Sequence, residues 1–195
     1  KKIMLEMPEV KKTLVAPDGN MYSLPYVNDC YHCSLDWNMY VYMPWLEKLG
    51  IKEPTTPDEF ERMLIAFKTQ DPNGNGKADE IPMAASSDYR SFADVFLMNA
   101  FIYDDGGNET GKRMIVEDGK IDVVYNKPEW SEGLRYINRL YSQDLIAQQS
   151  FTMDKATAKK LAENPDIAIM GAYPAHSPSS FTIIENPSNR WIDYQ

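Results

Sequence analysis

Oxygen-bearing side chains stand at alternate positions in the segment 71–80, which reads DPNGNGKADE. A hard divalent cation such as calcium takes about six to eight oxygen ligands at about 2.3–2.6 Å. A short loop supplies that many only if it curls tightly, and Gly76 stands where the sharp turn is needed. The segment therefore predicts a metal site. Its ligands would be the side chains of Asp71, Asn73, Asn75, Asp79 and Glu80 and the backbone carbonyl of Lys77.

The spacing matches most of an EF-hand loop. Asp71 takes position 1 and Asp79 position 9, with the two asparagines between them at 3 and 5. Position 12, a bidentate glutamate in an EF-hand, is Pro82 here, so Glu80 is left to complete the shell. An ordinary turn is the alternative, because Asn, Asp and Gly cluster in turns. Its acids would repel one another without a cation, so we expect a structural calcium ion.

Composition narrows the class of protein. A chain of 195 residues with 43% hydrophobic content suits a single globular lobe, which we expect to span 1–195. The formal net charge of −9 argues against nucleic acid and anionic membranes as partners. No apolar run approaches the roughly 18 residues of a membrane-spanning helix, and no signal peptide is evident. Both ends stop in mid-pattern, so we expect a piece of a longer protein.

Helices and short apolar runs alternate along the chain. A capping box at Thr56, with Pro57 and Glu59, starts a helix that leads into the metal loop. Further helices are predicted at 91–103, from 126 to 141 and at 154–163. Strands are predicted at 21–24, 38–42, 81–85, 167–170 and 181–184, and a hairpin at 113–116 and 120–124. This order predicts an α/β fold with a mixed sheet flanked by helices.

Several segments in the same order resemble extracellular solute-binding proteins of carbohydrate ABC transporters. They are 18–26 (DGNMYSLPY), 45–50 (WLEKLG), 54–60 (PTTPDEF), 67–82 (FKTQDPNGNGKADEIP) and 133–146 (GLRYINRLYSQDLI). The segment 67–82 is similar to the calcium loop of the oligosaccharide-binding branch, in which the last two acids replace the missing glutamate. The order of these motifs is far more specific than any one of them.

The resemblance implies a two-lobed, periplasmic-binding-protein-like type II fold, of which this chain would be one lobe. A non-enzymatic function follows: capture of an oligosaccharide or similar solute between the lobes, then delivery to permease subunits in the membrane. The full-length parent would be extracellular and anchored as a lipoprotein, or periplasmic. Calcium would be structural and would not touch the sugar.

Two loops are candidates for holding the ligand. Open α/β sheets bind ligands at the carboxyl ends of their strands. There the chain places SSDYR at 86–90 and GAYPAHS at 171–177, which offer aromatic faces and planar polar groups. The resemblance points to Asp88, Tyr89 and Tyr173, with Arg90 and His176 as additions. Packing within the lobe is the alternative for each aromatic residue.

Other residues leave alternatives open. Trp37 either lines the cleft or caps a strand. Cys30 and Cys33 form a C-x-x-C pair without the further ligands that zinc requires, so we expect a structural role.

Two rival functions remain. A carbohydrate-active enzyme would use an acid pair such as Asp104 with Asp105, or Asp88 with Glu185, although nothing in the spacing selects either. A calcium-dependent protein-interaction module of the dockerin type would carry two metal loops, and this chain has one.

Overall fold

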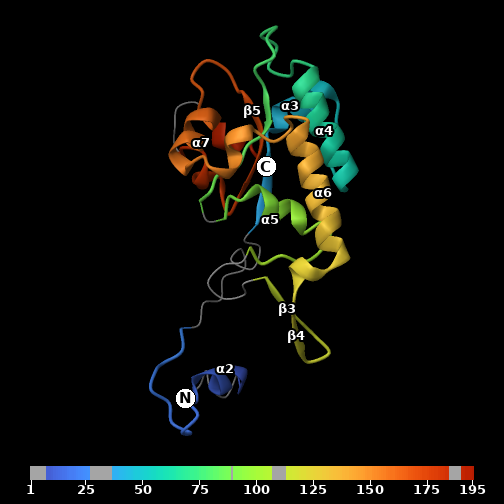
Figure 1. Cartoon of the computed structure of the whole chain (residues 1–195). Helices are drawn as coiled ribbons and strands as arrows, with labels where there is room; N and C mark the ends of the chain where they lie inside the picture. The colour runs from blue at the N-terminus through green and yellow to red at the C-terminus, as the bar shows by residue number, and fades with distance from the viewer. Residues whose placement is uncertain (1–7, 27–36, 89, 107–112, 185–189) are drawn as a thin grey trace. The chain divides into compact units, whose positions relative to one another are not determined.

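The computed structural model describes residues 8–26, 37–88, 90–106, 113–184 and 190–195 (Figure 1). The chain separates into two compact units, Lys1–Ser34 and Leu35–Gln195. A single lobe over all 195 residues therefore stays a prediction. Cys30 and Cys33 lie outside the described residues. Within the described parts, no helix is both long and apolar enough to cross a bilayer.

The first unit contains one described helix, α2 (Pro8–Leu14), followed by a tight turn. The turn is closed by a single antiparallel bridge between Val15 and Met21, with Gly19 at φ +83°. The predicted strand at 21–24 is wrong, because pairing stops after that one bridge.

A mixed sheet forms the centre of the second unit, as the sequence predicts. Its strands are β1 (Asn38–Val41), β2 (Ile81–Met83) and β5 (Met170–Ala175), in the order β1-β5-β2. β5 runs antiparallel to β1 and parallel to β2. A separate hairpin joins β3 (Met114–Glu117) to β4 (Lys120–Val123), which confirms the prediction of a hairpin there.

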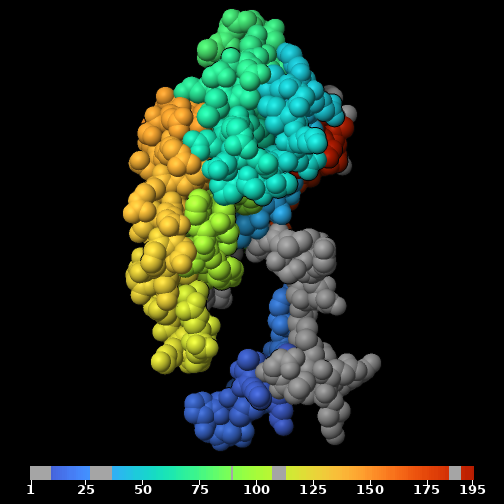
Figure 2. Space-filling model, turned by 90° about the vertical axis from the view of Figure 1, so that its right-hand side faces the viewer, coloured from blue at the N-terminus to red at the C-terminus, as the bar shows by residue number. Residues whose placement is uncertain are grey.

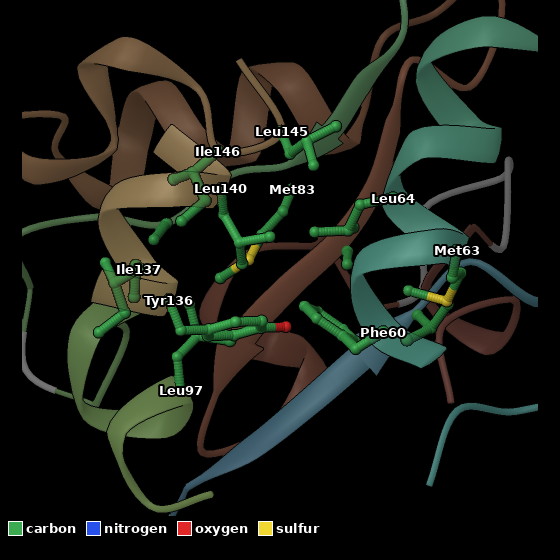
Figure 3. Packing of buried hydrophobic residues seen from close by; sticks show 14 of the residues in the cluster. Phe60, Met63, Leu64, Met83, Leu97, Tyr136, Ile137, Leu140, Leu145 and Ile146 are labelled. Atoms are coloured by element: carbon green, nitrogen blue, oxygen red, sulfur yellow. The ribbon is translucent and has the colours of Figure 1, made fainter. Parts of the chain in front are cut away.

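Helices cover both faces of the sheet (Figure 1). They are α3 (Met43–Leu49), α4 (Pro57–Thr69), α5 (Ala93–Met98), α6 (Pro128–Ser142) and α7 (Lys155–Ala162). Short 3-10 turns occur at Val124–Asn126, Gln148–Phe151, Pro178–Ser180 and Arg190–Ile192. The larger core joins α3, α4, α5 and α6 to the sheet, and Figure 3 shows apolar side chains from α4, α5 and α6 meeting there. A smaller core lies against α7.

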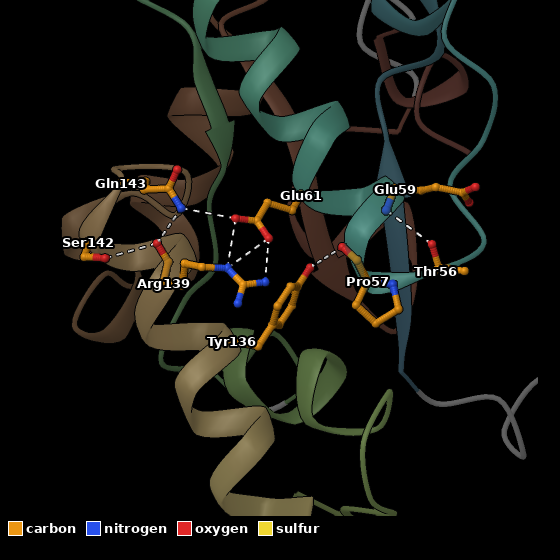
Figure 4. A network of polar contacts seen from close by, with 8 residues as sticks. All are labelled: Thr56, Pro57, Glu59, Glu61, Tyr136, Arg139, Ser142 and Gln143. Carbon is orange, nitrogen blue, oxygen red and sulfur yellow. Dashed lines mark hydrogen bonds and ion pairs between the residues drawn. The ribbon is translucent and has the colours of Figure 1, made fainter.

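The start of α4 follows its sequence signal closely. The Thr56 hydroxyl accepts the backbone N–H of Glu59 at 3.2 Å, as the capping box predicts. The Glu59 carboxylate reaches back one residue further than expected, to the N–H and hydroxyl of Thr55. Figure 4 shows α6 held against this end of α4 by polar contacts, in which the Tyr136 hydroxyl donates to the Pro57 carbonyl at 2.8 Å.

Two strand predictions near the C-terminal end need correction. The strand expected at 167–170 begins at Met170 and runs on to Ala175. No strand forms at 181–184, because Phe181 is fully buried between the rings of Tyr173 and Tyr194. The apolar run there packs the smaller core and pairs with no strand.

Candidate functional site

The 71–80 loop curls around the side chain of Asp71. Its carboxylate accepts the backbone N–H groups of Gly74, Asn75 and Gly76 at 2.9, 3.1 and 3.0 Å. Gly76 has φ +73° at the predicted sharp turn, a conformation that glycine adopts without strain. The loop therefore has the tight curl that a cation site of this length needs.

The two asparagines bridge the loop to its second acid. Their side-chain N–H groups donate to the carboxylate of Asp79, from Asn73 at 2.9 Å and from Asn75 at 2.9 and 3.2 Å. These hydrogen bonds hold the pKa of Asp79 below its ordinary value, and the one from Asn73 has the largest effect. The positive charge of Lys77 lowers the pKa of Asp79 further.

Glu80 carries the feature that best fits a cation in this loop. One of its carboxylate oxygens is buried without a hydrogen-bond partner. Burial raises the pKa of Glu80, and the neighbouring charges of Asp71 and Asp79 raise it further. An orphaned carboxylate oxygen beside two more acids is unfavourable unless a cation balances it.

The donor set suits a hard cation, since it consists of oxygens only. Rotation of the Asn73 and Asn75 side-chain amides by half a turn would present their oxygens where their N–H groups now lie. No group of three or more His, Cys, Asp or Glu side chains is arranged to hold a metal among the described residues. A cation here would need amide and backbone oxygens as well.

A second candidate region lies at the opposite end of β2. The parallel strands β2 and β5 end at the same edge of the sheet, and β1 starts there, with Asn38 opposite Ala175. The structure thus brings Trp37, residues 86–88, Arg90 and His176 to one edge, which we call the ligand edge. The His176 carbonyl accepts from the side chains of Asn38 and Tyr40, each at 3.4 Å.

The metal loop precedes β2, whereas the ligand edge follows it. In Figures 1 and 2 the 71–80 loop lies at one end of the second unit and the β3–β4 hairpin at the other. A cation in this loop and a ligand at the ligand edge would therefore lie at opposite ends of β2.

Three of the predicted ligand residues at this edge differ in their contacts and burial. Asp88 accepts the backbone N–H of Lys155 at 2.5 Å, so its carboxylate stabilises the start of α7. Arg90 is half-buried and has φ +66°, in the left-handed region. Trp37 is half-buried and stacks on Phe92, with 5.9 Å between ring centroids. Tyr89 lies outside the described residues.

The position of Tyr173 contradicts its predicted role. It is 0% exposed and stacks on Phe181 with 4.6 Å between ring centroids. Burial raises the pKa of its phenol. A ring with no exposed face cannot stack on a sugar, so the prediction that Tyr173 binds the ligand is wrong for this structure. The residue packs the smaller core instead.

The acid pair considered for an enzyme has a structural explanation. Asp104, whose side chain is fully buried, lies 3.2 Å from Arg113 Nε, and Asp105 accepts the backbone N–H of Arg113 at 2.9 Å. Arg113 also pairs with Asp94 at 3.0 Å. Burial raises the pKa of Asp104. Both acids thus anchor the base of the hairpin, and Glu185 lies outside the described residues.

Sequence reasoning missed Phe92 and Gly106, which seat Trp37. A Cβ on Gly106 would come within 2.8 Å of Cζ2 of Trp37, so glycine leaves room for the indole. The positive φ of +80° at Gly106 was the one signal of this role, and it is a property of the backbone that no pattern of residue types reveals.

An apolar pocket of about 420 Å³ lies beside β1, and its lining includes none of the predicted ligand residues. Its walls come from β1, α3, the connection at 53–56, the start of α4, α5 and α6. They are formed by Met39, Val41, Met43, Leu46, Glu53, Pro54, Thr55, Thr56, Pro57, Phe60, Phe96, Leu97, Ala100, Tyr136 and Gln195.

The chain is similar in sequence to a transporter component and to a lipoprotein. No protein-family model matches the chain. It is 36% identical over 161 residues to the fructooligosaccharide ABC transporter substrate-binding protein FusA of Streptococcus pneumoniae, covering 79% of this chain and 29% of that protein. It is 32% identical over 143 residues to the lipoprotein LipO of Bacillus subtilis, covering 71% and 26%. The chain thus spans less than a third of the curated relatives that it matches.

Solved structures agree with these relatives. FusA of S. pneumoniae in complex with kestose matches at a TM-score of 0.75 and 30% identity, covering 100% of this chain and 38% of that one. A solute-binding protein of Bifidobacterium longum infantis, associated with an ABC transporter and described as binding HMO, matches at 0.75 and 28%, covering 99% and 39%. A FusA EF-hand mutant, at 0.74 and 30%, is also similar and covers 100% and 38%. The chain therefore belongs with the substrate-binding proteins of sugar ABC transporters, and it matches one part of them.

Proposed function

We propose that the chain is part of a solute-binding protein that captures an oligosaccharide for an ABC importer. The observation that carries the proposal is the convergence of Trp37, Asp88, Arg90 and His176 on the carboxyl-end edge of the sheet. Open α/β sheets bind their ligands at this edge. The similarity to FusA, which was solved with kestose, supports a saccharide as the solute.

The mechanism that we propose involves binding and closure without bond chemistry. An indole such as that of Trp37 offers a flat face to the C–H side of a sugar ring, and charged planar groups such as Arg90 bind its hydroxyls. A second lobe would close over the sugar by a hinge motion and present it to a membrane permease. The longer protein would act outside the cell membrane as an anchored lipoprotein, as the similarity to LipO suggests.

We further propose that the 71–80 loop binds calcium as a structural ion. Its ligands would be the side chains of Asp71, Asn73, Asn75, Asp79 and Glu80 with the carbonyl of Lys77. Support comes from the curl around Asp71 and from the orphaned oxygen of Glu80. The ion would balance the acids of the loop and fix the connection between α4 and β2.

Calorimetry with kestose, longer fructans and an unrelated disaccharide tests the saccharide proposal. Trp37→Ala should weaken binding, because it removes the one half-buried indole at the ligand edge, while Leu134→Ala on the exposed face of α6 should not. Equal affinity of both variants would remove Trp37 from the site. Release of reducing ends during incubation would instead favour a carbohydrate-active enzyme.

Thermal melts with calcium and with a chelator test the metal proposal. A ligand that binds only the native state raises its stability by RT ln(1 + [L]/Kd). Calcium should therefore raise the melting temperature of the wild type and have little effect on Asp79→Asn. Glu132→Gln on the exposed face of α6 is the matched control and should respond as the wild type does. A wild-type melt that thorough chelation leaves unchanged would refute the calcium site.

A further inference from the structure

The ammonium group of Lys48 lies against the backbone at the entrance of the 71–80 loop. Lys48 belongs to the last turn of α3, and its Nζ donates to the carbonyls of Pro72 at 2.9 Å and Asp71 at 3.4 Å. The fit is close, since a Cβ on Gly74 would come within 2.7 Å of Nζ. α3 thus delivers a positive charge to the loop from outside it.

This charge interacts differently with the two states of the loop. Without an ion, Asp71, Asp79 and Glu80 repel one another, and a nearby ammonium offsets part of that repulsion. With calcium bound, the acids are already balanced, and the same ammonium repels a doubly charged cation. The two contacts of Lys48 are with carbonyl oxygens, so no carboxylate in them neutralises its charge.

We propose that Lys48 is a resident cation of the loop, which stabilises the ion-free conformation and thereby lowers the affinity for calcium. The inference rests on the calcium site proposed above. A group shifts a binding equilibrium only by the difference between its interactions with the free and the bound state. Lys48 stabilises the ion-free loop and destabilises the calcium-bound loop, so both effects lower the affinity for calcium. It is a positioning residue and would not touch the ion.

Calcium titration by calorimetry at low ionic strength, with melts in chelator, tests the inference on the intact chain. Lys48→Met should raise the calcium affinity about three- to ten-fold and lower the melting temperature of the ion-free protein. The gain in affinity should shrink in high salt, because salt screens the repulsion. Lys52→Met changes the net charge equally at an exposed position four residues further along the chain. It should leave the calcium affinity within about two-fold of the wild type and the melting temperature of the ion-free protein unchanged.

Two more variants separate charge from tethering. Lys48→Gln keeps an N–H donor for the loop carbonyls but loses the charge, so its affinity should also rise, and it serves if the methionine variant folds poorly. Lys48→Arg keeps the charge and should stay near the wild type. An affinity that is unchanged or lower in both uncharged variants would overturn the inference and leave the calcium site standing. A wild type that binds no calcium would overturn both.

Discussion

Replacement of Tyr173 by alanine should destabilise the fold strongly. The side chain is 0% exposed and lies in the middle of β5, opposite Tyr40 on β1. It stacks on Phe181, whose ring also contacts Tyr194 at 5.0 Å between centroids. Truncation would therefore open a cavity beside the rings of Tyr40, Phe181 and Tyr194, because these rings also pack on one another and cannot move far to fill it.

The size of the effect follows from this burial. An aromatic side chain buries about 150–250 Å², and at about 25 cal/mol per Å² this amounts to roughly 4–6 kcal/mol before the methyl group of alanine is counted. Measured truncations of buried aromatic residues fall at about 3–5 kcal/mol. We expect about 4 kcal/mol, which lowers the melting temperature of a unit of this size by roughly 10 °C.

Tyr173→Phe is the matched control, because the phenolic oxygen is buried with no protein partner in good hydrogen-bond geometry; its polar neighbours are the hydroxyls of Ser86 and Ser91. Loss of this hydroxyl should change stability by no more than about 1 kcal/mol. Urea unfolding, followed by circular dichroism, measures all three proteins. A loss below about 1 kcal/mol in the alanine variant, together with weaker sugar binding, would refute the assignment of Tyr173 to the core and restore its predicted role at the ligand.

Two further substitutions test the packing and the polar contacts of the helices. Glu61→Gln should cost about 1 kcal/mol at neutral pH, because the carboxylate accepts from Arg139 at 2.6 and 3.0 Å. These bonds lower the pKa of Glu61 below its ordinary value of 4.5, so its stabilisation is present above that pH and is lost as the pH falls through the folded-state pKa. Urea unfolding between about pH 3 and pH 7 should show the difference between wild type and variant vanish at the acid end, and a difference that persists there would contradict an ionic origin. Gly171→Ala should destabilise by about 3 kcal/mol or more, since the new methyl would lie 2.5 Å from the ring of Phe67 and 2.8 Å from a backbone oxygen. Gly133→Ala, where the obstacle is the flexible end of Met98, should be milder, and equal losses in the two variants would refute the argument from rigidity.

Much of the fold could be predicted from sequence because local signals and burial agree there. The capping box at Thr56 gives a start to α4 that the structure reproduces, and the turn at Asp118 and Gly119 gives the β3–β4 hairpin. Both features depend on residues close together in the chain. Their conformations are therefore set by local geometry, whatever packs against them later.

Predictions failed where an apolar residue could serve either a strand or the core. Phe181 begins a run typical of a strand, yet its ring packs among those of Tyr173, Tyr194 and the distant Tyr40 of β1. Tyr173 falls within the predicted binding loop 171–177, yet β5 runs through this segment to Ala175 and is buried along its whole length. The order of residues does not tell which face of a strand is covered, because that depends on elements far away in the sequence.

The most direct test of the account is a titration of the isotope-labelled chain with kestose, followed by NMR. Half of a binding cleft binds weakly, so the sugar should be raised to the order of 10 mM. The account predicts that the indole signal of Trp37 and the amide signals of Asp88, Arg90 and His176 shift together, while those of the 71–80 loop stay unchanged. Shifts confined to other surfaces of the chain, or none at all at that concentration, would contradict it.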